Sequence, residues 1–249
     1  MSQEVAPTID SLPGFRRRFR ITPAPGRVQC DVEDDYHCMS VVVHHAGGVA
    51  THIEPRMSRA PWTTCPGAVA KLQQTFAGTP LAGFSERGEK TDNCTHLYDL
   101  ALLAAAHAGD ATPLIYDILV ADAIDGRRHA ELRRDGKTLL AWVESEFRIV
   151  EPASIGGTPL MQLGRWIASL EPSMQEPARL LRWGNLLAHG RAIPMERQSD
   201  ATRMPSNCYS FQPQRAVDAR RVGEIRDFSR GGATPLGEVT TGPDAEVIN

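Results

Sequence analysis

The sequence lacks three glycine-containing motifs that mark common enzyme classes. It has no glycine-rich dinucleotide-binding loop, no phosphate-binding P-loop and no Gly-x-Ser-x-Gly nucleophile elbow. These absences disfavour nicotinamide-dependent redox enzymes, kinases and serine hydrolases. They leave open the enzyme classes that work through cysteine, histidine or a metal ion.

Long apolar runs and an excess of positive charge are also missing. No run approaches the roughly 20 residues that a membrane-spanning helix needs, and residues 1–9 lack the basic and apolar regions of a secretory signal. The net charge is -3, whereas nucleic-acid binding draws on clustered positive charge. We expect a cytoplasmic protein whose partners are a small-molecule substrate and, at most, further copies of the chain, with no nucleic acid and no membrane.

Two basic clusters, Arg16 to Arg20 and Arg127 to Arg134, stand out against this background. Both have the pattern of strands, and we interpret their cations as a solvated face rather than a phosphate site. Cysteine is scarce, and its odd number fits neither a zinc ribbon nor a disulfide-rich secreted scaffold. We therefore expect reduced thiols at all five positions, Cys30, Cys38, Cys65, Cys94 and Cys208.

The order of the remaining patterns predicts an α+β fold: an antiparallel β-meander followed by two helices, then a second meander with helices. β-Branched runs separated by Gly-containing turns indicate the strands. Proline and alanine-rich segments indicate the helices. The expected strands are 15–21, 27–33, 36–45, 49–54, 114–121, 129–134 and 138–149, and the expected helices begin near Cys65 and Thr95 or cover 160–170 and 176–187.

Four segments follow from this reading. Residues 1–12 and the Gly- and Thr-rich tail 229–249 are expected to be disordered. A site-bearing unit covers 13–110, and a second α+β unit, 111–228, packs on it. The irregular stretch Met204 to Pro213 contains aromatic residues, and we interpret it as a cover over the site.

Two cysteines stand where helices are expected to begin, in Thr64-Cys65-Pro66 and Asn93-Cys94-Thr95-His96. Unpaired N–H groups at a helix N-terminus favour thiolate over thiol, which lowers the pKa and makes cysteine a nucleophile or a metal ligand. His96 would then act as general acid or base. We take Cys65, Cys94 and His96 as the candidate catalytic centre.

The same residues also form a candidate metal centre. Cys65, Cys94 and His96 with His37 are ligands suited to zinc or iron. Alternation along a strand places His37 on the face of Met39 and Val41, and its neighbour Cys38 on the opposite face, so only one of the two points into a given site. The acidic pair Asp34-Asp35 is interpreted as a turn, with orientation of the His37 imidazole or binding of a hard cation as alternatives.

Three residues near the first cysteine are candidates for substrate binding. The guanidinium groups of Arg56 and Arg59 match a carboxylate or phosphate with two donors. Trp62 would wall a pocket for a flat substrate. For each of them the alternative is a structural role, in a solvated loop for the arginines and under a loop for the indole.

Several strings resemble the bacterial family known as domain of unknown function 2889. They are Asp34 to Met39, Glu54-Pro55, Arg59 to Ala68 and Cys94-Thr95-His96-Leu97, and the likeness covers roughly residues 12 to 110. The later stretch Met204 to Pro213 is similar to one branch of the family. Many members have Gly at position 93 and Asp at position 38, where this chain has Asn93 and Cys38. If that Asp is a ligand, Cys38 replaces it.

A more distant likeness, in the order of elements alone, is to the scaffold proteins of iron-sulfur cluster assembly, with Cys38, Cys65 and Cys94 in the corresponding places. The expected function is a cytoplasmic enzyme of bacterial small-molecule catabolism. It would perform lyase, hydratase or hydrolase chemistry on a small carboxylic acid or acyl compound at a Cys/His centre, with zinc or iron as the candidate cofactor. The alternative is a zinc or iron-sulfur binding accessory protein without turnover.

Overall fold

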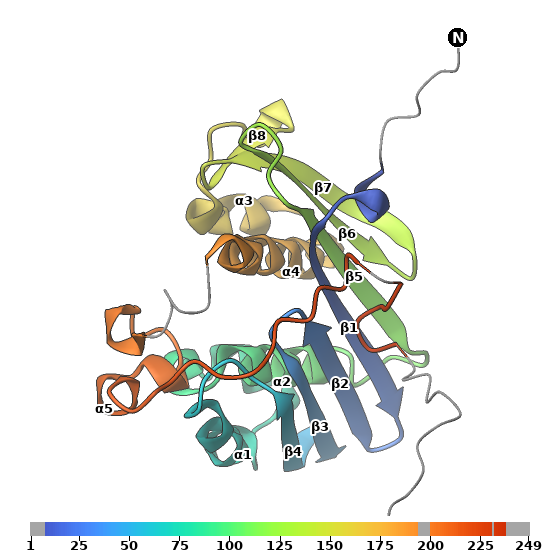
Figure 1. Cartoon of the computed structure of the whole chain (residues 1–249). Helices are drawn as coiled ribbons and strands as arrows, with labels where there is room; N and C mark the ends of the chain where they lie inside the picture. The colour runs from blue at the N-terminus through green and yellow to red at the C-terminus, as the bar shows by residue number, and fades with distance from the viewer. Residues whose placement is uncertain (1–7, 194–199, 231, 238–249) are drawn as a thin grey trace, which may run out of the picture.

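One antiparallel sheet of eight strands runs through the molecule, with helices against one of its faces (Figure 1). This computed structural model describes residues 8–193, 200–230 and 232–237. The fold is α+β, as the sequence predicts. Strand order is β4-β3-β2-β1-β5-β6-β7-β8. The strands are β1 (Gly14–Ala24), β2 (Arg27–Asp34), β3 (Cys38–Ala46), β4 (Val49–Arg59), β5 (Leu114–Ala121), β6 (Arg127–Arg134), β7 (Lys137–Ser145) and β8 (Arg148–Glu151).

The two central strands, β1 and β5, join two four-stranded halves. They pair antiparallel over eight positions, from Gly14 opposite Ala121 to Ile21 opposite Leu114. Every other residue of β1 faces the helices, so Phe15, Phe19 and Ile21 are buried in the main core. Each half thus contributes one edge of the sheet, and the helices of both halves meet over its centre.

The helices are α1 (Ala68–Phe76), α2 (Thr95–Ala106), α3 (Gly164–Ser169), α4 (Pro172–Ala188) and the short α5 (Pro213–Ala216). In the first half α1 packs on β4 and α2 on β2 and β3, whereas α4 covers β5 and β6 in the second. Proline is the first residue of α4 and of α5, where its missing N–H removes no helical hydrogen bond. None of the helices within the described residues is long and apolar enough to cross a bilayer.

The structure corrects one expected strand and the interpretation of one basic cluster. The expected strand 138–149 is two strands, because the chain reverses at Glu146 and Phe147, which both have positive φ. The arginines of β1 are not a solvated face: Arg16 and Arg17 are 8% and 4% exposed. Arg16 donates to the carbonyls of Ile9, Leu12 and Phe15.

The expected helix 160–170 is a 3-10 turn at Leu160–Gln162 followed by α3. The expected helix 176–187 begins four residues earlier, at Pro172. Of the termini expected to be disordered, 1–7 and 238–249 lie outside the described residues. The described parts of the two termini are ordered: Ile9–Ser11 forms a 3-10 turn, and the Leu236 N–H donates to Glu33 Oε2 at 2.8 Å.

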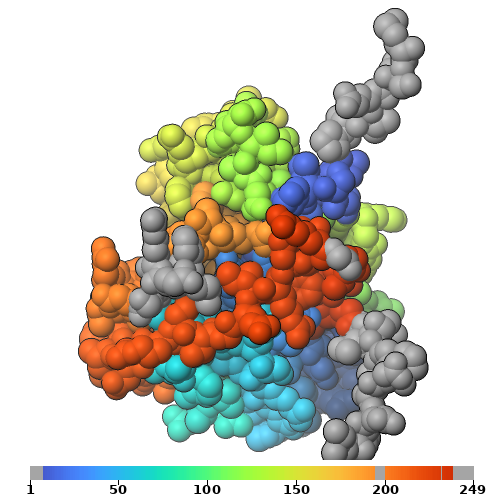
Figure 2. All heavy atoms as spheres, in the orientation of Figure 1, coloured from blue at the N-terminus to red at the C-terminus, as the bar shows by residue number. Residues whose placement is uncertain are grey.

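The C-terminal segment that begins at residue 200 connects the two halves. In Figure 1 it runs from α5 past α2 towards the centre of the sheet, and Figure 2 shows it, orange to red, across the face where the halves meet. Its backbone is bonded to the first half, since Thr63 N–H donates to Arg220 and Tyr209 N–H to Asn93. The segment therefore forms part of the wall between the two groups of helices.

Close packing of α4 on β5 depends on Gly184. A Cβ at this position would lie 2.6 Å from Ile118 Cγ2 on β5, so we expect Gly184→Ala to destabilise the protein by about 1–3 kcal/mol. Urea unfolding measures the change. Gly164→Ala in α3 is the matched control, because an added Cβ there meets nothing within 4 Å. Equal stability of the two variants would contradict this account of the interface.

Candidate active site

The turn between β2 and β3 is held by one buried carboxylate. Asp34 ends β2 and is 0% exposed. Its Oδ1 accepts the backbone N–H groups of Tyr36 and His37, each at 2.8 Å, and lies 2.9 Å from His37 Nδ1. Arg17 Nη1, reaching across from β1, donates to Oδ2 at 2.5 Å. The carboxylate thereby fixes both the turn and the His37 ring.

Charge decides which nitrogen of His37 carries the proton. Burial alone would raise the pKa of Asp34, but the nearby His37 and Arg17 outweigh it and hold this pKa well below its usual range. An ionised carboxylate only accepts hydrogen bonds, so His37 Nδ1 is the donor. Within the described residues no hydrogen bond reaches His37 Nε2, so in the neutral form of the ring this nitrogen is open to accept a proton.

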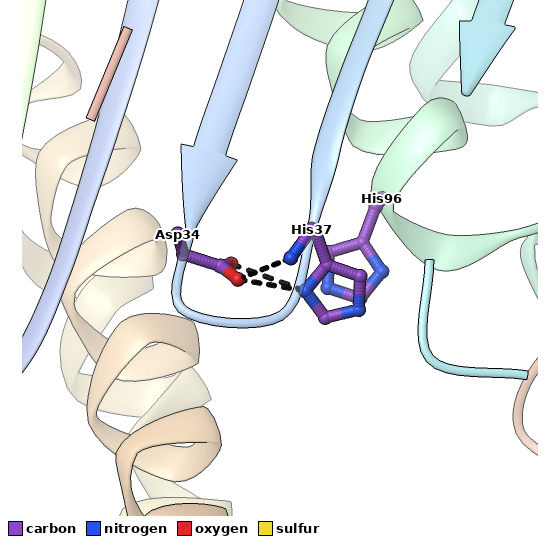
Figure 3. Close-up of side chains that lie close together, drawn as sticks. All are labelled: Asp34, His37 and His96. Atoms are coloured by element: carbon purple, nitrogen blue, oxygen red, sulfur yellow. Dashed lines mark hydrogen bonds and ion pairs between the residues drawn. The ribbon is translucent and has the colours of Figure 1, made fainter. Parts of the chain in front are cut away.

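A second imidazole stacks on the first. His96 is the second residue of α2, and its ring centroid lies 3.9 Å from that of His37, with the planes 30° apart (Figure 3). Burial, together with the charges of His37 and Arg17, holds the pKa of His96 well below its ordinary value. His96 is therefore neutral at pH 7 and stands at a helix N-terminus, where it can donate a hydrogen bond without carrying charge.

These groups open into a cavity of about 400 Å³ between the helices of the two halves. Its size is typical of a small-molecule site. The first half supplies the polar end, and α4 and the C-terminal segment supply mostly apolar groups. The residues that line it include Arg17, Tyr36, His37, Met39, Trp62, Cys65, Cys94, His96, Asp99, Met161, Trp183, Leu186, Leu187, Met204, Cys208, Tyr209, Ser210, Phe211 and Arg221.

The two helix-start cysteines line the cavity, but the expected thiolates are wrong. Burial raises the pKa of Cys94 to about 12, although the N–H groups of Leu97 and His96 lower it in part. Burial also raises the pKa of Cys65, which accepts a hydrogen bond from Ser210 Oγ at 3.3 Å. Desolvation of the thiolate thus exceeds the helix-end effect. Cys94 Sγ lies 4.0 Å from His96 Nδ1, a thiol beside a neutral imidazole.

We expect Cys94 to react slowly with iodoacetamide. With a pKa of about 12, only about one thiol in ten thousand is ionised at pH 8, against roughly a quarter for an ordinary cysteine. Peptide mapping after timed labelling should show Cys94 modified at least about 100-fold more slowly in the folded protein than in urea. Rapid labelling of Cys94 in the folded protein would contradict this expectation and support Cys94 as a thiolate nucleophile.

The three expected substrate-binding residues have different positions. Trp62 is 4% exposed and lines the cavity. Arg59 lies outside the cavity lining: it donates to the backbone carbonyls of Asp34, Asp35 and His37 and so clamps the β2–β3 turn. Arg56 is exposed on β4, also outside the lining. Neither arginine therefore contacts the cavity directly, although Arg59 supports the turn that carries His37.

The structure brings together only part of the expected set of metal ligands, which was Cys65, Cys94, His96 and His37. Within the described residues, the group of three ligands whose atoms all lie within 4.8 Å of one another consists of Asp34, His37 and His96, and it includes no cysteine. Alternation predicted that only one of the neighbours His37 and Cys38 would point into the site without deciding which; His37 lines the cavity and Cys38 lies outside its lining. Asp34 Oδ1 and Oδ2 already accept from backbone and side-chain donors, so Asp34 is better suited to orienting His37 than to binding an ion.

Arg17 and Tyr36 are among the lining residues that sequence reasoning missed. Arg17 was assigned to a solvated face, although the alternation of Phe15, Arg17 and Phe19 places it on the buried face of β1. Tyr36 carried no signal of its own, since its place depends on the turn that Asp34 holds. Searches of protein-family models and of curated proteins gave no match to this chain. What the site does has to follow from its own geometry.

Proposed function

We propose that the protein is an enzyme that moves a proton at a carbon next to a carbonyl group, in a lyase or hydratase reaction on a small carboxylic acid or acyl compound. The observation that carries this proposal is the Asp34–His37 pair stacked on His96 at the wall of the cavity. A base of fixed tautomer beside a neutral donor is what enolate chemistry requires.

The roles follow from the geometry. His37 Nε2 takes the proton, while Asp34 holds the ring and stabilises the imidazolium that forms. His96 donates to the developing enolate oxygen, and its neutral form makes it a donor matched to that oxygen. Cys65 and Cys94 then act as thiol groups of the cavity wall. Hydrolysis, with His37 activating water, is the neighbouring reaction that the same base would support.

The proposal also assigns a role to each part of the chain. We take residues 13–110 as the unit that carries the centre and 111–228 as the unit that closes the cavity, in the order meander, helices, second meander, helices. Trp183, Leu186 and Leu187 of α4 supply the opposite wall. Excluding water from the centre in this way strengthens its electrostatic interactions.

Solvent exchange tests the proposal without knowledge of the natural substrate. The protein is incubated in D2O with a panel of 2-oxo acids and acyl thioesters, and proton NMR measures deuterium incorporation at the carbon next to the carbonyl group. We expect catalysed incorporation into some members of the panel. Wild type should incorporate deuterium faster than the His37→Gln variant. An absence of catalysed exchange across the panel, with hydrolysis also absent, would sink the proposal.

Metal binding without turnover is a second candidate function, favoured by the mutual distances among Asp34, His37 and His96. Here His37 Nε2 and His96 would ligate zinc or iron, and Asp34 would be the carboxylate behind the ligating histidine. Metal content of untagged protein tests this function. Stoichiometric metal that is lost in His96→Ala, in protein that catalyses no exchange, would favour it over the enzyme.

A further inference from the structure

Two buried hydrogen-bond donors at the cavity have no partner among the described residues: Tyr36 Oη and Arg17 Nε. Both residues line the cavity, and they are only 7% and 4% exposed. A buried polar group left unsatisfied costs about 1–3 kcal/mol. A ligand oxygen in the cavity would offer the Tyr36 hydroxyl group an acceptor.

The Tyr36 ring is held in place while its hydroxyl group is left unbonded. Its backbone N–H is bonded to Asp34, and its ring stacks on Phe15 with centroids 6.4 Å apart. Gly190 lies opposite the hydroxyl, and a Cβ there would come within 3.3 Å of Oη. Burial raises the pKa of Tyr36 to about 12, so the phenol keeps its proton and serves as a donor.

The wall beside this donor is aromatic and carries positive charge. Trp62 and Phe211 meet edge to face, with centroids 5.5 Å apart. The guanidinium carbon of Arg221 lies 5.4 Å from the Trp62 ring centroid and 5.5 Å from that of Tyr36. Flat rings pack well against such edge-to-face pairs, and the guanidinium favours an anionic group near Tyr36.

We propose that the cavity binds a small aromatic carboxylate, with its ring against Trp62 and Phe211 and its carboxylate oxygen on Tyr36 Oη. This inference rests on the proposed function, because it names the substrate class of the same centre. It places the polar end of the ligand on the β2–β3 turn that also carries His37. The apolar part then fills the space toward Leu187 and Met39.

Calorimetric titration of the full chain with cinnamate tests the inference. Hexanoate keeps the carboxylate without the ring, and cinnamyl alcohol keeps the ring without the carboxylate. We expect cinnamate to bind at least about tenfold more tightly than either, since each comparison removes one set of contacts. Equal affinity for hexanoate and cinnamate, or no cinnamate binding, overturns the proposal.

The Tyr36→Phe variant tests the position of the carboxylate, because it removes only the hydroxyl group. Cinnamate affinity should fall by about 10- to 100-fold, as for loss of a hydrogen bond to a charged group, and cinnamyl alcohol affinity should change much less. Tyr98→Phe is the control: Tyr98 is 3% exposed and packs on Phe76, outside the cavity lining. An unchanged cinnamate affinity in Tyr36→Phe overturns the proposal.

Phe211→Leu tests the aromatic wall and should reduce the preference for cinnamate over hexanoate; an unchanged preference counts against that wall. These titrations involve no turnover and so separate the two proposals. Cinnamate binding without any catalysed deuterium exchange or hydrolysis would overturn the proposed function and keep this inference. Catalysed exchange on aliphatic acids, with no preference for binding cinnamate over hexanoate, would support the proposed function and overturn this inference.

Discussion

Replacing His37 by glutamine should lower the rate of catalysed deuterium exchange by about 10²- to 10⁴-fold, the contribution that a general base makes. The side chain keeps a similar size and polarity, but its amide cannot accept the proton. Because Asp34 would still bond to the backbone N–H groups of the turn, the fold should be retained. Proton NMR in D2O gives the rate, and thermal unfolding checks the fold.

His52→Gln is the matched control for this variant. The His52 side chain is 60% exposed on β4, lies 3.9 Å from the Glu54 carboxylate and near the His44 ring, and is outside the cavity lining. Its exchange rate should equal that of wild type. A His37→Gln protein that keeps its fold and exchanges as fast as the control would remove His37 from the mechanism.

The Asp34→Ala variant should lose about 3–5 kcal/mol of stability at pH 7, as when one partner of a buried ion pair is removed. The substitution leaves the Arg17 guanidinium buried without its carboxylate and frees two backbone N–H groups of the turn. The folded-state pKa of Asp34 is lowered. Its contribution is therefore present at neutral pH and lost as pH falls through the folded-state value.

Urea unfolding at several pH values measures this loss. Asp31→Asn is the comparison on the same strand: its carboxylate bonds to Gln29 two residues away, and the variant should change stability by less than about 0.5 kcal/mol. The difference between Asp34→Ala and wild type should shrink in acid. A small loss at pH 7, equal to that of Asp31→Asn, would show that Arg17 does not depend on this carboxylate.

Local patterns were sufficient to predict two hairpin turns and the start of α2 at Thr95. The Gly47-Gly48 and Asp135-Gly136 turns have the positive φ values that such hairpins need. The helix expected to begin near Cys65 is instead a 3-10 turn, Cys65–Gly67, followed directly by α1. The break between β7 and β8 was missed because neither Glu146 nor Phe147 is a residue type that usually takes positive φ. Tertiary packing determines that turn.

The candidate site was predicted as a set of residue types but not as a geometry. His37, Cys65, Cys94, His96 and Trp62 do line one cavity. Their chemistry could not be predicted, because the pKa of Cys94 depends on burial that arises only when the two halves meet. Asp34 was interpreted as a turn residue or as an orienting group, and its hydrogen bonds fit both roles.

Apart from the stretch Met204 to Pro213, which was interpreted as a cover and which does contribute Phe211 to the lining, the long-range partners had no signal in the sequence. Arg17 and Asp34 come from paired strands, but His96 joins them only through the packing of α2 on β2 and β3. The opposite wall, with Trp183 and Phe211, comes from segments more than 80 residues further along the chain. Spacing along the chain says nothing about such convergence.

Nitrogen-15 NMR of the imidazoles tests the central claim most directly, because it reports which nitrogen of His37 carries the proton. For the neutral form of His37 the account predicts a proton on Nδ1, bonded to Asp34, and a bare Nε2, with this preference weakened in Asp34→Asn. It also predicts that His96 is neutral at pH 7, because burial lowers its pKa well below the ordinary value. A proton on His37 Nε2 with Nδ1 bare, or a charged His96 at pH 7, would contradict an acid–base centre of this design.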